Sequence, residues 1–410
     1  MAIIRPFRAV RPHEKVAHLV ASVPYDVVNK EEAAALAVDN PISFLRVTRS
    51  EIELDKNSDA YSDQVYLKAK EIFNRIKNEA PLLQDEKAAF YVYRQIMGSH
   101  SQVGIAATFS VDDYDNDIIM KHEKTRRVKE DDRTNHIITT EAQTGAVFLT
   151  YKGVAEVNNV VNKTMESDPL YNFTSPDGII HTLWLMPDDY YDIIKFEINK
   201  VEKLYIADGH HRAASASRAQ KIMKERNVGH TGQEEYNFFL AVLFPAEQLK
   251  ILPYNRIVHD IKNMGADQFK SLIKKHFDIK ETENPTPPEK GIICMYLENK
   301  WYQLLPNKDV VPGEAVGDKL DVSTLQNFLL HPFLDIEDPR TDNNIDFIGG
   351  IRGTEELEKL VNSGKAAVAF SLYPVSVEDL INISNAGETM PPKSTWFEPK
   401  LRDGLVVHII

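Results

Sequence analysis

The chain has 410 residues, a length that predicts two domains, and its 43% hydrophobic and 27% charged residues are typical of an ordinary globular protein. With 48 Lys and Arg against 61 Asp and Glu, the formal net charge is −13, which argues against a surface that binds nucleic acid or anionic lipid throughout. The single cysteine, Cys294, excludes an internal disulfide and a multi-cysteine metal site. The N-terminal apolar run is short and no apolar stretch reaches about 18 residues, so we expect a cytoplasmic protein that does not bind membranes.

In chain order, the first half of the sequence predicts helices and then strands. Asn29 followed by Glu31, Glu32 and AAALA is typical of a helix that begins after an N-cap. In 59–78 the apolar residues recur at close to 3.6 residues, which predicts a second helix. A polar helical stretch is expected at 121–136. Strands are expected at 88–95, 103–111, 146–150, 181–186, 203–207 and 238–244.

A domain boundary is predicted at 281–291, ETENPTPPEKG, because this segment concentrates proline and charge as linkers do. We therefore expect an N-terminal domain over 1–280 and a smaller α/β domain over 292–410, whose last strand could return to the first domain. Strands are expected at 292–297, 300–304, 345–348 and 366–372, and helices at 323–330, 355–362 and 377–385. This pattern makes the fold class mixed α/β or α+β.

The most informative segment is 203–226, KLYIADGHHRAASASRAQKIMKER. It predicts a short apolar strand, a turn at Asp208 and Gly209, and a helix that begins at His210 or His211. A helix N-terminus leaves backbone N–H groups unpaired and carries about half a positive charge, which favours phosphate.

This turn is therefore a candidate phosphate or nucleotide site. Gly209, His211 and Arg212 are the expected binding residues, because a guanidinium in the first turn adds paired donors. Asp208, His210 and His211 are the catalytic candidates. The alternative is that Asp208 only caps the helix and the histidines are solvated. A zinc site is disfavoured, because adjacent helical residues point about 100° apart.

Six segments of the chain resemble the pattern of a bacterial family, domain of unknown function 1015. They are VPYDVV at 23–28, NPISFLRV at 40–47, HEKTRRVKEDDR at 122–133, DGIIHTLW at 177–184, IADGHHR at 206–212 and MPPKSTWFEPKLRDGLVVH at 390–408. The resemblance spans nearly the whole chain.

The DGHHR string also resembles the phosphate-binding turn of the ParB/sulfiredoxin superfamily, whose members include free-serine kinases with a similar Asp-Gly-His-His string. This local resemblance implies a ParB/sulfiredoxin-like core, with free L-serine or O-phosphoserine as the substrate. Sulfiredoxin chemistry needs a cysteine where this chain has Gly209. The net charge of −13 disfavours the DNA-partitioning branch, so the kinase branch remains.

A second cluster of basic residues lies in 121–136. If this segment is helical, five side chains share one face: His122, Arg126, Lys129, Arg133 and His136. We expect this stripe to bind phosphate. The alternative is a solvated amphipathic helix held by i,i+4 ion pairs.

Several carboxylates are candidates for proton transfer or for a magnesium ion, which commonly shares oxygen ligands with phosphate. Glu123 is the catalytic candidate among them. Asp208, Glu130 or Asp132 is the expected magnesium ligand, and the sequence does not choose between them. Asp26 in PYDVV is a further candidate, although an aspartate there also suits a turn.

A third cluster lies in 390–400, MPPKSTWFEPK. Lys393, Ser394 and Thr395 are expected to bind phosphate, and Lys400 to reach a phosphate or a carboxylate. A strap stiffened by its prolines and packed against the core explains the segment almost as well. In HTLW, His181 and Trp184 are interpreted as strand residues rather than ligands.

Together these clusters predict a small-molecule phosphotransferase, serine kinase-like and able to run in either direction. ATP, ADP or another phosphate donor is the expected second substrate. Phosphoryl transfer needs mainly positioning and charge stabilisation, which such clusters supply. P-loop, Rossmann, zincin and protein-kinase motifs do not occur in the sequence. Two other functions stay open: a non-catalytic nucleotide-binding regulatory protein and a metal-dependent phosphoester hydrolase.

Overall fold

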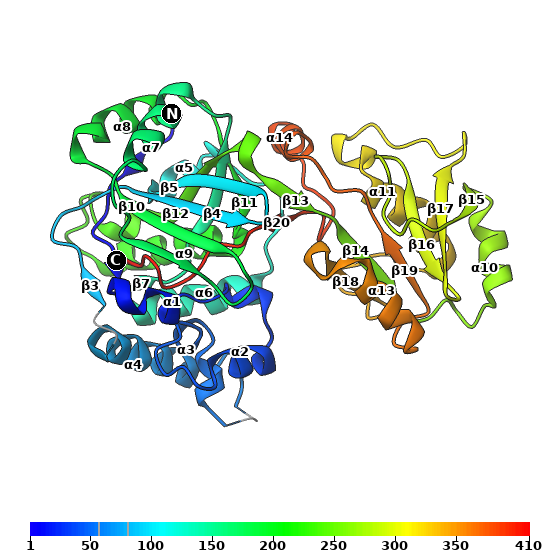
Figure 1. Cartoon of the computed structure of the whole chain (residues 1–410), viewed down its shortest axis with the longest axis horizontal. Helices are drawn as coiled ribbons and strands as arrows, with labels where there is room; N and C mark the ends of the chain where they lie inside the picture. Colours follow the sequence, from blue (N-terminus) through cyan, green and yellow to red (C-terminus); the bar gives the residue numbers. More distant parts are fainter. Residues whose placement is uncertain (56–57, 80–81) are drawn as a thin grey trace. The chain divides into compact units, whose positions relative to one another are not determined.

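The computed structural model describes residues 1–55, 58–79 and 82–410, which form two compact units (Figure 1). Unit 1 contains Met1–Leu249 and Pro399–Ile410, and unit 2 contains Lys250–Glu398. The C-terminal segment thus lies with the first unit. Both units combine sheets and helices, so the mixed α/β class expected from the sequence is confirmed.

The boundary expected at 281–291 is corrected, because this segment lies inside unit 2. It connects β15 (Phe277–Thr282) and β16 (Ile293–Leu297), which both pair with β17 (Lys300–Pro306). Proline and charged residues favour any exposed connection, and here they form a loop between two strands of one sheet.

Unit 1 is built on a nine-stranded mixed sheet of order β6-β11-β8-β12-β5-β4-β10-β9, with β1 paired to β5. The pairs β6·β11 and β8·β12 are parallel, and the other pairs are antiparallel. The strands are β1 (Ile4–Arg5), β4 (Tyr91–Met97), β5 (His100–Ser110), β6 (Ile119–Met120), β8 (Val147–Tyr151), β9 (Tyr171–Thr174), β10 (Ile180–Leu185), β11 (Leu204–Asp208) and β12 (Phe238–Pro245).

Helices cover both faces of this sheet, and Figure 1 shows α7 and α8 on one side and α6 and α9 on the other. They are α1 (Ala17–Val20), α2 (Lys30–Ala37), α3 (Leu45–Thr48), α4 (Asp63–Glu79), α5 (Val111–Asp115), α6 (Arg127–Thr140), α7 (Ala155–Thr164), α8 (Tyr191–Asn199) and α9 (His210–Arg226). Two small ribbons complete the unit: β2 (Val10–Arg11) with β3 (Leu83–Gln84), and β7 (Ala142–Gln143) with β21 (His408–Ile409).

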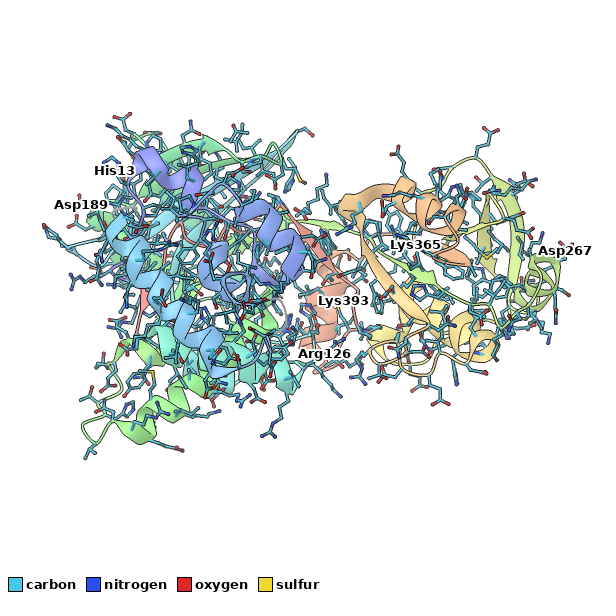
Figure 2. The ribbon with its side chains drawn as sticks, turned by 90° about the horizontal axis from the view of Figure 1, so that it is seen from below. His13, Arg126, Asp189, Asp267, Lys365 and Lys393 are labelled. Atoms are coloured by element: carbon cyan, nitrogen blue, oxygen red, sulfur yellow. The ribbon has the colours of Figure 1, made fainter. Side chains whose placement is uncertain are left out.

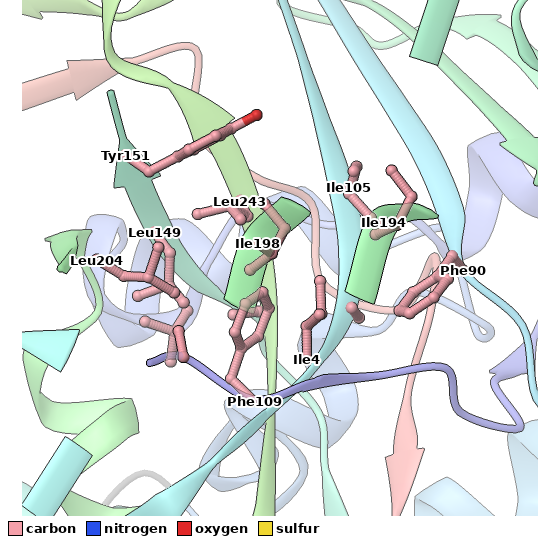
Figure 3. Close-up of a cluster of buried hydrophobic side chains, with 14 of the residues drawn as sticks. Ile4, Phe90, Ile105, Phe109, Leu149, Tyr151, Ile194, Ile198, Leu204 and Leu243 are labelled. Atoms are coloured by element: carbon pink, nitrogen blue, oxygen red, sulfur yellow. The ribbon is translucent and has the colours of Figure 1, made fainter. Parts of the chain in front are cut away.

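A large apolar cluster lies between the sheet and its helices (Figure 3). Ile105 and Phe109 of β5 pack there with Leu149 of β8 and with Ile194 and Ile198 of α8. Each of these side chains is at most 2% exposed, so their burial supplies a large part of the driving force for folding unit 1.

Two local predictions are confirmed by the helices. Asn29 caps α2, its side chain accepting from the Glu32 N–H at 2.8 Å while the Glu32 carboxylate accepts from the Asn29 N–H. In α4 the residues at helical spacing, among them Val65, Ala69 and Ile72, are buried as the apolar period predicts.

Unit 2 contains a six-stranded antiparallel sheet of order β15-β17-β16-β19-β14-β18. Its remaining strands are β14 (Tyr254–Val258), β18 (Ile345–Gly349) and β19 (Val368–Ser371), and a separate ribbon pairs β13 (Lys250–Leu252) with β20 (Trp396–Glu398). Its helices are α10 (Ala266–Ile273), α11 (Asp321–Leu325), α12 (His331–Leu334), α13 (Gly353–Asn362) and α14 (Val377–Asn385). The strands and helices predicted between 292 and 385 are all present, with bounds shifted by a few residues.

Candidate functional site

The turn between β11 and α9, which we call the α9 turn, has the geometry that the sequence predicted: a strand, a glycine and the start of a helix. β11 ends at Asp208 and α9 begins at His210. Gly209 between them has a φ of +92°, a backbone conformation that favours glycine. A Cβ at this position would also lie 3.3 Å from the Arg212 guanidinium and 3.4 Å from the Val147 backbone. The turn therefore needs glycine for both its conformation and its close packing.

Asp208 forms an ion pair with Lys400 from the C-terminal segment, with Oδ2 and Nζ 2.7 Å apart. The side chains of Asp208 and Lys400 are 28% and 13% exposed, so both are partly accessible to solvent. Burial by itself raises the pKa of Asp208, but Lys400 and Arg212 outweigh burial and hold that pKa below its usual range. Asp208 is thus an ionised carboxylate at neutral pH. The expectation that Lys400 reaches a carboxylate is confirmed.

His210 points into the protein rather than toward a ligand at the helix end. Its ring meets the buried His122 ring edge-on at 4.3 Å, and its Nε2 accepts from the His122 backbone N–H at 3.4 Å. Glu123 approaches from the other side, with Oε2 3.9 Å from Nδ1 of His210. Burial lowers the pKa of His210 to about 3, more than Asp208 raises it, so this imidazole stays neutral.

His211 is half-buried and links the starts of two helices. Its Nε2 accepts from the backbone N–H of Arg126 at 3.0 Å. Arg126 directly precedes α6, and its side chain is exposed (Figure 2). The N-termini of α6 and α9 therefore lie close together at His211, and both contribute partial positive charge. An anion placed there would be stabilised by both helices.

The structure places the side chain of Arg212 inside the protein. Its side chain is 8% exposed and turns inward, donating to the backbone carbonyl of Ala146 and pairing with Oδ2 of Asp26 at 3.4 Å. Burial lowers the pKa of Arg212, but the nearby carboxylates of Asp26, Asp208 and Asp403 raise it by more than that. The pKa therefore lies above its usual value. Arg212 thus holds the turn against the core and brings Asp26 to it.

Behind the turn lies a cavity of about 30 Å³, lined by both polar and apolar residues, which has room for one or two waters. Arg212, Arg133 and Asp403 line it. Nε of Arg212 and Oδ1 of Asp403 are buried without a hydrogen-bond partner. Asp403 is 2% exposed, and burial raises its pKa to about 7 despite the nearby Arg212. Sequence reasoning missed Asp403, although it lies in the matched string MPPKSTWFEPKLRDGLVVH.

The basic stripe predicted along 121–136 does not form, because α6 begins only at Arg127. His122 and Arg126 lie in the preceding loop, held by their contacts with His210 and His211. Lys129 donates to the Tyr61 hydroxyl at 3.0 Å.

The last two members of the expected stripe are held by protein groups. Arg133 pairs with Asp132 at 3.0 Å and lies over the Tyr25 ring at 4.2 Å. His136 shares a 3.1 Å hydrogen bond with the Val47 carbonyl. Packing of α6 on its neighbours, rather than a ligand, thus sets the directions of these side chains.

The three carboxylates expected to bind magnesium do not form a ready site. Glu130 pairs with Arg218 at 3.4 Å, Asp132 is bound by Arg133, and Asp208 by Lys400. Across 1–55, 58–79 and 82–410, no group of three or more His, Cys, Asp or Glu side chains is placed to hold a metal ion. A magnesium ion at Asp208 would have to displace Lys400, so the residues present do not fit one.

Lys393, Ser394 and Thr395 belong to unit 2, whereas the α9 turn belongs to unit 1 (Figure 2 labels Lys393). The buried guanidinium of Arg256 donates to the carbonyls of Pro392 at 3.2 Å and Lys393 at 3.0 Å. Ser394 Oγ donates to the Pro391 carbonyl at 2.6 Å. These bonds favour the strap interpretation of this segment.

His181 and Trp184 are residues of β10, as expected. His181 is fully buried and shares hydrogen bonds with the Tyr93 hydroxyl at 2.7 Å and with Nε of Arg402 at 3.2 Å. Arg402 also pairs with Asp177. This network fastens the C-terminal segment to the β9–β10 hairpin and so helps to place Lys400 and Asp403.

Unit 1 thus defines a mixed α/β protein with a charged strand-turn-helix site completed by its C-terminal segment. Residues 4–323 match the family model described as "Protein of unknown function (DUF1015)", and the chain belongs to that family. No curated protein matches the chain. Within the described residues, no helix has the length and apolar character needed to cross a membrane.

Three solved structures are similar to parts of this chain. One is SbnI with C-terminal truncation from Staphylococcus aureus, with a TM-score of 0.38, 15% identity, and coverage of 74% of this chain and 87% of that one. Another is a conserved hypothetical protein from Pyrococcus furiosus, with a TM-score of 0.37, 13% identity, and coverage of 75% and 95%. The third is a free serine kinase in complex with AMP, with a TM-score of 0.37, 10% identity, and coverage of 74% and 91%.

Proposed function

We propose that this protein is a phosphotransferase that moves a phosphoryl group between a nucleotide or other donor and free serine, in either direction. The observation that carries the proposal is the ionised Asp208–Lys400 pair at a turn where the N-termini of two helices meet at His211. The positive charge of such a site can bind a polyanion, and its carboxylates can orient or deprotonate a hydroxyl group. The serine substrate and the ParB/sulfiredoxin-like core rest on the resemblance of the DGHHR string.

In this proposal the serine hydroxyl attacks the donor phosphorus, its proton passes to a carboxylate, and the donor leaves with one phosphate fewer. A carboxylate with a low pKa is a weak base, so we assign Asp208 to orienting the hydroxyl and Glu123 to accepting the proton. Lys400, His211 and the partial positive charge of the two helix N-termini stabilise charge on the transferred group. His210 and Arg212 hold the turn in place.

The test is turnover of L-serine with ATP, ADP or pyrophosphate, and of O-phosphoserine in reverse, followed by phosphorus NMR. Lys400→Met and His211→Ala are each expected to lower kcat/KM by about 10² or more, because each removes charge stabilisation at the transferred group. Glu123→Gln is expected to lower kcat by about 10²–10⁴, the usual contribution of a general base. His13→Ala, a histidine in the N-terminal segment, is the matched control and should retain activity.

No turnover by wild-type protein with any donor, together with tight nucleotide binding, would favour the non-catalytic binding protein. Release of phosphate without a phosphorylated acceptor would favour the hydrolase. Full activity of Lys400→Met would contradict the site assignment.

A further inference from the structure

A cavity of about 170 Å³ lies at the carboxyl ends of β8 and β12, the parallel pair in the middle of the unit 1 sheet. Its walls come from these strand ends, from the start of β5 and from one face of α7. Tyr151, Ile105 and Leu243, which Figure 3 labels in the apolar cluster, belong to its lining. In open α/β sheets, ligands commonly bind at the carboxyl ends of strands.

This cavity is separate from the α9 turn. In the antiparallel pairing of β11 with β8, Asp208 lies opposite Phe148, at the amino end of β8. Tyr151 lies three residues further along the strand, about 10 Å away at 3.3 Å per residue. The α9 turn therefore lies near the amino end of β8, and the cavity lies at its carboxyl end.

The eleven residues that line the cavity are all uncharged, in a chain that is 27% charged. Val157, Val161 and Leu243 give it an apolar floor. A charged ligand would lose hydration there without gaining an ionic partner, so the cavity suits a neutral molecule.

Three side-chain amides supply the polar groups of the cavity. Asn158 and Asn162 lie one turn apart on α7, on the face that lines it. Gln248 is fixed at the opposite wall, because its Oε1 accepts from the Val103 N–H at 2.8 Å, which leaves its NH₂ group free to donate. Each amide offers a donor and an acceptor in one plane, the pattern that pairs with the edge of a nucleobase.

We propose that this cavity binds the neutral ring of a nucleobase, with its faces on the valine and leucine side chains and its edge on the amides of Asn158 and Asn162. The volume is below the 300–1,000 Å³ typical of drug-sized ligands, so it suits one ring system rather than a whole nucleotide. The proposal does not depend on phosphoryl transfer, because a nucleoside carries no phosphate for the α9 turn.

The test is calorimetric titration of the full chain with adenosine, with free ribose as the sugar-only probe. Adenosine should bind saturably and ribose should not. Asn158→Leu and Asn162→Leu keep nearly the same side-chain size and should each weaken adenosine binding about tenfold, because the ligand edge loses its paired amide. Val161→Trp should abolish binding by filling the cavity.

Asn159→Leu is the matched control, because Asn159 is exposed on the same helix and does not line the cavity. It should change the affinity by no more than about twofold. Absence of adenosine binding to wild-type protein would overturn the proposal. So would an equal loss in Asn159→Leu and Asn162→Leu, or loss of adenosine binding in His211→Ala, which would place the nucleoside at the α9 turn.

Discussion

Arg212 of unit 1 and Arg256 of unit 2 are both buried, and their guanidinium groups have different kinds of partner. Arg212 of unit 1 is 8% exposed and surrounded by Asp26, Asp208 and Asp403, which together raise its pKa. Arg256 of unit 2 is 2% exposed, and its hydrogen-bond partners in the described chain are backbone carbonyls. Burial lowers the pKa of Arg256 to about 9.

The difference separates a charge network from a structural tie. Around Arg212, removing the cation takes the ion-pair partner from Asp26 and leaves the buried Asp403 without its neighbouring guanidinium, so the α9 turn depends on the network. Around Arg256, the guanidinium donates to the Tyr254 carbonyl and to two carbonyls of the strap segment, and among the described residues it has no carboxylate as a hydrogen-bond partner. A buried arginine by itself therefore does not indicate a ligand site, and its partners decide its role.

The largest effect is expected from Arg212→Met. It removes the cation from between Asp26 and Asp403, which should destabilise unit 1 by about 3–5 kcal/mol. Hydrogen exchange of the α9 amides would measure the loss. Arg226→Met, at the exposed end of the same helix, is the control and should leave exchange unchanged. Unchanged exchange in Arg212→Met would show that the network does not hold the turn.

A smaller, pH-dependent effect is expected from Asp403→Asn. The pKa of Asp403 is raised from 3.8 to about 7, so the folded protein keeps a proton that the unfolded chain loses in this interval. The contribution of Asp403 to the free energy of unfolding of the wild type should therefore fall as pH rises from about 4 to about 7. Between these two pH values, the free energy of unfolding of Asp403→Asn should rise relative to that of the wild type by at most about 4 kcal/mol, at about 1.4 kcal/mol per pKa unit.

Urea unfolding at a series of pH values would measure this difference. Asp189→Asn replaces an exposed carboxylate and should run parallel to wild type at every pH. A constant difference between Asp403→Asn and wild type would contradict the assignment of a raised pKa.

The smallest effect is expected from Arg256→Met. It leaves the carbonyls of Pro392 and Lys393 without donors, which should cost about 1–3 kcal/mol. Removal of a buried cation offsets part of this cost. Faster hydrogen exchange confined to the strap around Lys393 would confirm the tie, with the exposed Arg352→Met as control. A loss as large as that of Arg212→Met would remove the distinction between the two arginines.

The sequence by itself determined the local structure. The strand, glycine turn and helix at 203–226, the capping box at Asn29 and the apolar period of α4 all follow from residues within one or two helical turns of each other. Such patterns depend on capping, periodicity and backbone freedom, which act over short distances along the chain. The existence of a charged turn at Asp208–Arg212 was therefore predictable.

Only the tertiary structure decided what each side chain of that turn does. His210 and Arg212 turn inward because His122, Ala146 and Asp26 pack against them, and α6 starts later than its charge pattern indicated. The C-terminal segment brings in two charged neighbours of the turn from nearly two hundred residues away, Lys400 beside Asp208 and Asp403 beside Arg212. Side-chain direction and burial depend on such distant neighbours, and no local pattern in a single sequence encodes them.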